Sequence, residues 1–225
     1  MSGHYTAQPT IQDGQSSPRL ALGAWVLANA LGLGTTFAMF GIVGEGMQAA
    51  GAEHDTAGWG VPTLAAMIVG GSLFAYLRQR VLGSPSRWPQ TLVIGVVIAA
   101  GFVAGWFPPI DFVTGIFVAG VVGGAFQLRE ARRLGHPGKL LVLSVGAWLV
   151  AGLAAVAAAI LVADVIISGA LGRADMVDGV GGFVAVLALA GVVGGAVGGA
   201  IEGIAVRSRL ARSRAATSPL LGSAT

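Results

Sequence analysis

Six stretches of apolar residues, separated by short polar segments, follow one another along most of the chain. A helix that crosses the hydrocarbon core of a bilayer needs about 20 apolar residues, with a range of about 17–25. Because lipid offers no partner for backbone N–H and C=O groups, we expect each stretch to form a helix. The predicted spans are residues 20–43, 59–77, 91–107, 112–128, 140–163 and 180–206.

Polar segments flank the six spans. Residues 1–19 are rich in Ser, Gln and Pro, which predicts a disordered cytoplasmic tail. Residues 207–225 are predicted to form a second, basic disordered tail. A cleaved signal peptide is the competing interpretation of the first stretch. That stretch is longer than the apolar region of a signal peptide, which has about 7–15 residues.

A weak internal repeat favours three helical hairpins. Each odd span opens with a Trp, and each even span carries a Gly-Gly pair before its basic end. Interfacial Trp and small packing residues are common in any membrane protein, so a bundle without repeated hairpins is the alternative. The residues that repeat are Trp25, Trp88 and Trp148, and the pairs Gly70-Gly71, Gly123-Gly124 and Gly198-Gly199.

Basic residues gather on one side of this alternating pattern. They precede the first span, separate the second from the third and the fourth from the fifth, and follow the sixth. Of the 13 Lys and Arg residues, only Arg173 falls on the other side. Cytoplasmic loops carry an excess of Lys and Arg, so both chain ends are predicted to be cytoplasmic. The predicted fold is an all-α, integral membrane six-helix bundle.

Composition agrees with this class of protein. Hydrophobic residues make up 55% of the chain and charged residues 10%, whereas a soluble domain carries about 25% charged residues. The chain has too few charges to cover a water-facing surface. It also has no cysteine, which excludes disulfides, thiolate metal sites and cysteine nucleophiles.

Glycines crowd the sixth span in the stretch GVVGGAVGGAIEG, residues 191–203. The stretch lacks the glycine order of a dinucleotide-binding fingerprint and the Lys of a phosphate-binding loop. On a helix at about 100° per residue, its glycines fall on one half of the circumference. Such a repeated GxxxG face lets another backbone approach closely. The predicted packing residues are Gly191, Gly194, Gly195, Gly198, Gly199 and Gly203, with Gly120 and Gly124 as a similar pair in the fourth span.

Glu202 is the charged residue of the sixth span, and it falls in the middle of the glycine face. Ionisable residues inside a membrane are costly, face the bundle interior and mark ion or proton pathways. The functional hypothesis is therefore a proton or cation site. The alternative is a structural carboxylate, either bonded to an inner-loop arginine or reaching the interface near Arg207.

Four further polar residues join Glu202 in the candidate transport site. Gln127 and Asn29 lie in the predicted cytoplasmic half of their spans. They would line a path or, alternatively, form interhelical hydrogen bonds worth about 0.6 kcal/mol each. Glu45 and Asp164 lie at the outer ends of the first and fifth spans, where they form an acidic opening or simply solvate the span ends.

Catalytic signatures are missing from the spans. The sequence has no HExxH or GxSxG motif, and no span places a nucleophile beside a base. Lys139 and the three histidines lie outside the spans, which excludes an intramembrane Schiff base and supports no His-ligated haem. We predict a protein that is not an enzyme and that holds no metal or other cofactor.

The lipid bilayer is the main predicted partner. The basic segment after the sixth span attracts anionic lipid headgroups at about 1 kcal/mol per residue. Since topology alone requires basic residues there, nucleic acid is not expected. The glycine faces suit a second copy of the chain or another membrane protein. The basic residues of this segment are Arg207, Arg209, Arg212 and Arg214.

The segments AWVLANALG (24–32) and GGAFQLREARRLG (123–135) resemble helical-hairpin units of small glycine-rich bacterial membrane proteins of uncharacterised function. Those units begin with Trp-x-x-Ala-Asn-x-x-Gly and end with Gly-Gly-x-x-Gln. In this chain Phe74 and Glu202 stand where the Gln is expected in the second and sixth spans. The resemblance implies a multi-pass protein of the bacterial cytoplasmic (inner) membrane and implies no activity.

Two functions are compatible with these features. The first is a non-enzymatic packing or assembly protein, or an accessory subunit, that uses the glycine-rich helix faces. The second is a transporter or channel for a small solute or ion, with a polar site around Glu202. The sparse polar content and the lack of paired helices broken by Gly or Pro favour the first.

Overall fold

A computed structural model of the protein describes residues 21–51, 57–82, 88–104, 137–167 and 180–217. These residues form helices and no strand, as the all-α prediction requires. The predicted fourth span, with Gln127, Gly120 and Gly124, lies outside the described residues. The helices are α1 (Leu22–Ala49), α2 (Ala57–Val81), α3 (Trp88–Ala104), α5 (Pro137–Ile167) and α6 (Val180–Thr217).

Four of these helices are long and apolar enough to cross a bilayer. The apolar segments are Leu22–Ala49, Gly60–Val81, Leu141–Val165 and Gly181–Ser208. In α3 the apolar stretch is shorter, Trp88–Gly101. By length and composition, the described chain is that of a helical membrane protein. The count of six spans and the division into three hairpins stay predictions.

Two helices extend beyond the predicted spans at their polar ends. The last turn of α2 contains Arg78 and Arg80, whereas the predicted span ended at residue 77. The structure also differs from the predicted disordered tail over residues 207–217, which continue α6. Apolar content marks where lipid ends, but it does not end a helix. Ala and Arg, which are abundant in this segment, are among the best helix formers.

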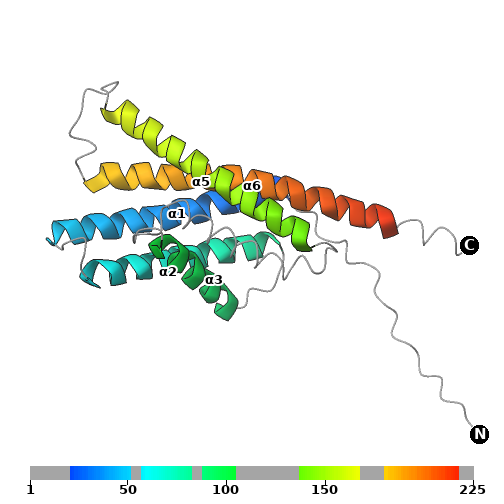
Figure 1. The fold of residues 1–225 in the computed structure, drawn as a ribbon, viewed down its shortest axis with the longest axis horizontal. Coiled ribbons are helices and arrows are strands. Elements are labelled where there is room, and N and C mark those ends of the chain that lie inside the picture. Colours follow the sequence, from blue (N-terminus) through cyan, green and yellow to red (C-terminus); the bar gives the residue numbers. More distant parts are fainter. Residues whose placement is uncertain (1–20, 52–56, 83–87, 105–136, 168–179, 218–225) are drawn as a thin grey trace, which may run out of the picture.

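α1 lies between α2 and α6, and α5 packs on α6 while α3 packs on α2. Figure 1 shows α5 crossing α6 at an angle, while α1 runs beside α6. α1 and α2 run antiparallel, because Gly32 of α1 lies against Phe74 of α2 while Gly70 of α2 lies against Thr36 of α1. This arrangement brings Arg78 of α2, Ser144 of α5 and Glu202 of α6 to the same level of the bundle.

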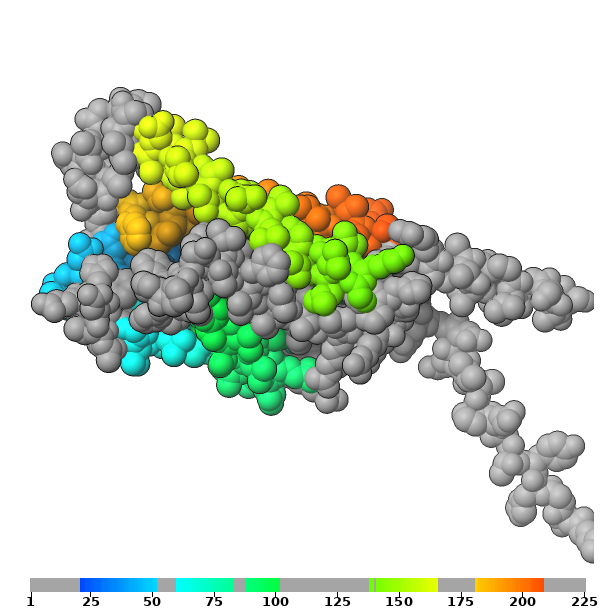
Figure 2. All heavy atoms as spheres, in the orientation of Figure 1, coloured from blue at the N-terminus to red at the C-terminus, as the bar shows by residue number. Residues whose placement is uncertain are grey.

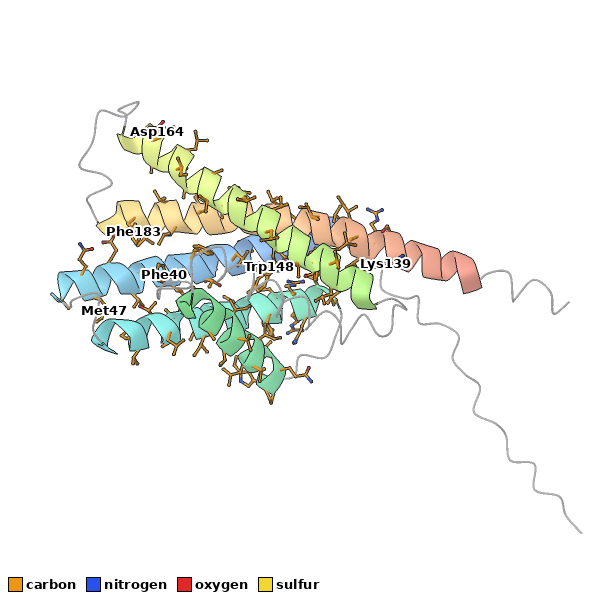
Figure 3. The ribbon with its side chains drawn as sticks, in the orientation of Figure 1. Phe40, Met47, Lys139, Trp148, Asp164 and Phe183 are labelled. Atoms are coloured by element: carbon orange, nitrogen blue, oxygen red, sulfur yellow. The ribbon has the colours of Figure 1, made fainter. Side chains whose placement is uncertain are left out.

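Basic residues lie at one end of the described helices, and Asp164 lies at the other. Figure 3 shows Lys139 at one end of α5 and Asp164 at the other, the end where Met47 of α1 also lies. The end with Lys139 is also the end at which α2 finishes with its two arginines and α6 continues into its basic segment. We call it the basic end. The predicted cytoplasmic location of this end rests on the charge pattern.

Large apolar side chains point outward from the described helices. In α5, Val142 is 72% exposed and Leu153 is 71% exposed. Figure 2 shows this helix running across the near face of the molecule. A soluble protein rarely exposes so much contiguous apolar surface, whereas lipid tails cover such a surface without cost. The exposed surface of α5 is therefore suited to a bilayer.

Candidate functional site

Three polar side chains from three helices meet in the interior near the basic end. Arg78 of α2 donates from Nη2 to Oε2 of Glu202 in α6 at 2.8 Å. Ser144 of α5 donates from Oγ to Oε1 of the same carboxylate at 2.8 Å. All three residues are buried, with exposed fractions of 5%, 4% and 1% for Arg78, Glu202 and Ser144. We call these three residues the polar centre.

The pattern of glycines in α6 explains why Glu202 points into the interior. The glycines form two rows, one against α1 and one against α5, and Glu202 falls between the two rows on the helix circumference. A Cβ added to Gly194 would stand 2.8 Å from the carbonyl oxygen of Ala151 in α5. The row against α5 is Gly194 and Gly198, and the row against α1 is Gly191, Gly195, Gly199 and Gly203.

Aromatic rings surround the guanidinium group of the polar centre. The Cζ atom of Arg78 lies 4.6 Å from the centroid of the Trp25 ring and 5.1 Å from that of Phe74. Trp148 of α5 meets Phe74 edge to face, with centroids 5.5 Å apart and an interplanar angle of 85°. Phe74 is four residues before Arg78, so both project from one face of α2. We call Trp25, Phe74 and Trp148 the aromatic enclosure.

Two of these rings carry N–H groups without a partner among the described residues. The Nε1–H groups of Trp25 and Trp148 are both buried, and neither donates a hydrogen bond to a described residue. Oε1 of Gln79, the neighbour of Arg78, likewise accepts none from these residues. A buried N–H usually finds an acceptor. Packing therefore positions both indoles: the Trp25 ring lies against Arg78, and the Trp148 ring lies against Phe74.

Asn29, a predicted lining residue, is buried but lies outside the polar centre. Its Nδ2 donates to the backbone carbonyl of Trp25, four residues earlier in the same helix, at 2.7 Å. Its side chain and backbone pack against Gly195 and Gly199 of α6. The amide is thus used within α1, where its bulk fills the space that the glycines leave.

The structure does not bring the two predicted outer carboxylates to Glu202. Glu45 lies near the end of α1 and is half-buried, and Asp164 lies near the end of α5 and is exposed. Figure 3 shows Asp164 far along α5 from Trp148, which marks the level of the aromatic enclosure. The candidate residues described in the structure therefore separate into a buried group and two residues at the opposite end.

Arg78 and Ser144 were not among the sequence candidates. The charge of Arg78 assigned it to a loop, and Ser144 was one of several isolated hydroxyls. One signal was present: Phe74 and Glu202 each stand three residues after a Gly-Gly pair. Both residues contact Arg78 in the structure.

Ser144→Ala is expected to lower the free energy of unfolding by about 1.5–3 kcal/mol, the range for a hydrogen bond to a charged group. The loss leaves Oε1 of Glu202 without its Ser144 donor in a buried place. Thermal unfolding in detergent, followed by circular dichroism, measures the effect. Ser208→Ala is the control, because that hydroxyl is exposed and donates to a carbonyl of its own helix. Equal losses in the two variants would contradict the assigned role of Ser144.

Comparisons of the chain with protein-family models, with curated proteins and with solved structures each found no match.

Proposed function

We propose that this protein is a membrane transporter or channel for a small cation, and that the carboxylate of Glu202 binds the cation on its path. A bond between Glu202 and an arginine of the basic end was the structural alternative predicted from the sequence, and this bond is present. The observation that carries the proposal is the burial of both charges within helices suited to a membrane. Ionisable residues inside membrane bundles commonly pair with one another and mark ion or proton pathways.

The position of the pair supports this role. Glu202 lies five residues before Arg207, or about 7–8 Å along the helix at 1.5 Å per residue. Arg78 is three residues before the end of α2. A carboxylate at this depth is close enough to the basic end to exchange a cation with water, while the pair itself is closed to solvent. Under this proposal, the arrangement with the ion pair formed is the closed state.

The function that the sequence favoured, a packing, assembly or accessory subunit, uses the glycine faces as contact surfaces for a partner. The six glycines of residues 191–203 lie against α1 and α5 of the same chain. A partner would need a different surface, and Gly120 and Gly124 lie outside the described residues. For this reason the proposed function rests on the polar centre and not on the glycines.

Flux in liposomes tests the proposal. Purified protein is reconstituted into liposomes that contain the pH dye pyranine, and a gradient of H⁺, Na⁺, K⁺ or methylguanidinium is imposed in turn. For the cations other than H⁺ a protonophore is added, so that their movement drives a compensating H⁺ flux that the dye reports. We expect the wild-type protein to increase flux above protein-free liposomes for at least one of these cations. Glu202→Gln should return the flux to the protein-free level, because the amide cannot bind a cation by charge.

Lys139→Gln is the control, since it removes an exposed charge at the same end of the described helices. It should retain the wild-type flux. The folded fraction of each variant is matched by size-exclusion chromatography before reconstitution. A wild-type protein indistinguishable from protein-free liposomes would contradict the proposed function, as would equal flux in wild type and Glu202→Gln. The polar centre would then be a structural clamp between α2, α5 and α6.

A further inference from the structure

The polar centre together with the aromatic enclosure has the composition of a binding site for an organic cation. Two aromatic faces lie within 5.1 Å of the guanidinium carbon of Arg78, and a carboxylate lies 2.8 Å from its Nη2. Cations over the faces of Trp and Phe are attracted by the ring quadrupole, and the attraction increases when water is excluded. A carboxylate adds charge-assisted hydrogen bonds that suit a planar N–H donor.

We propose that this is a binding site for a guanidinium-like or similar small organic cation, and that Arg78 occupies it as an internal substitute for the ligand. The inference rests on the proposed function and deepens it, because it names the class of cation. In the bound state the ligand takes the place of the Arg78 guanidinium against Glu202, Trp25 and Phe74. The displaced Arg78 side chain turns toward the basic end.

The geometry permits this exchange. Arg78 lies three residues before the end of α2, about 4.5 Å along the helix at 1.5 Å per residue. A long arginine side chain reaches water over that distance, as basic side chains near span ends commonly do. The exchange replaces one guanidinium by another beside Glu202, so the carboxylate is not left without a counter-charge. It therefore avoids the cost of an unpaired buried ion.

The rings do not depend on Arg78 for their positions. Trp148 is held against Phe74 edge to face, and Trp25 packs against Gly203 of α6, where an added Cβ would stand 2.8 Å from Cδ1 of the indole. Within the part of the chain that the structure describes, neither indole N–H donates a hydrogen bond. The enclosure is thus preorganised by contacts among helices. It should keep its shape when the guanidinium is removed.

Arg78 acts as a competitor in this arrangement. A ligand that binds only when Arg78 has left the site shows an apparent affinity reduced by the fraction of time for which the site is free. Removing the arginine side chain should therefore strengthen ligand binding. This is the opposite of what a ligand-binding arginine would show. Removal of the side chain therefore distinguishes a competing arginine, whose loss strengthens ligand binding, from a ligand-binding arginine, whose loss weakens it.

The test measures binding of methylguanidinium by tryptophan fluorescence in detergent, with equal concentrations of NaCl as the reference. We expect Arg78→Ala to bind methylguanidinium about tenfold or more tightly than the wild-type protein, and to gain thermal stability from it. The double variant Arg78→Ala/Glu202→Gln should lose this binding, because the Glu202 carboxylate no longer faces the cation. Lys139→Ala, which removes an exposed charge, should bind as the wild type does.

Arg78→Lys keeps the assay decisive if Arg78→Ala does not fold without ligand. Lysine retains the charge but lacks the planar group that stacks on the rings, so methylguanidinium should bind more tightly to this variant than to the wild type. Folding of Arg78→Ala only when methylguanidinium is present would also support the inference. The inference is overturned if neither variant binds methylguanidinium more tightly than the wild type. It is equally overturned if the double variant retains the binding, or if the NaCl reference produces the same saturable change.

The outcomes for this inference and for the proposed function differ. Binding of methylguanidinium without flux of any tested cation would contradict transport and support the organic-cation site. Glu202-dependent flux of H⁺, Na⁺ or K⁺, with no binding of methylguanidinium by any variant, would support transport and overturn the organic-cation site.

Discussion

Glu202→Ala is expected to lower the free energy of unfolding by about 3–5 kcal/mol, the usual loss when one partner of a buried ion pair is removed. The alanine leaves the guanidinium of Arg78, which is 5% exposed, without its carboxylate. The aromatic faces of Trp25 and Phe74 attract the cation but do not neutralise it. Thermal or denaturant unfolding in detergent, followed by far-UV circular dichroism, measures the loss.

The double variant Arg78→Leu/Glu202→Leu separates an unpaired charge from a lost contact. Replacing both members of a buried pair by apolar residues of similar volume is often neutral or stabilising. We therefore expect the double variant to recover most of the stability that Glu202→Ala loses. A double variant as unstable as the single one would show that packing at this position, and not the unpaired charge, determines the effect.

Gly195→Ala is expected to cost about 1–3 kcal/mol, because the added methyl group meets backbone and not a flexible side chain. The Cβ would stand 2.8 Å from Cα of Ala30 and would also press on the carbonyl group of Asn29. Neither atom can move unless α1 and α6 separate along their shared length. Because α1 also packs on α2, the separation should disturb the polar centre as well.

Gly146→Ala is the matched control for this substitution. Gly146 lies in α5, and a Cβ at that position meets nothing within 4 Å. Alanine is the better helix former, so the control should be neutral or more stable by up to about 1 kcal/mol. Both variants are measured by thermal unfolding in detergent. If Gly195→Ala were as stable as Gly146→Ala, the close approach of α1 and α6 would be wrong.

The apolar pattern predicted where the described helices lie but not where they end. Each described helix overlaps a predicted span because about 20 apolar residues in lipid allow only a helix. The ends were less predictable. Arg78 and Arg207 interrupt the apolar runs, yet both are helical, since charge sets the lipid boundary while backbone hydrogen bonding continues beyond it.

The candidate site was only partly predictable. Glu202 was identified because it stands alone among apolar residues and shares the glycine face. Arg78 and Ser144 are 124 and 58 residues away from Glu202 in the chain. Their local sequence does not mark them as its partners. Asn29 shows the converse, because a polar residue in a span turned out to bond its own helix.

Local composition and the period of the α-helix were enough to predict that this protein is helical, that its helices suit a membrane, and that Glu202 faces other helices. The three-dimensional arrangement was needed to show that α1 and α5 pack against the two glycine rows. It was also needed to show that Arg78 is buried against Trp25 and Phe74. These contacts join residues distant in sequence, and packing in three dimensions selects among many similar glycine and alanine faces.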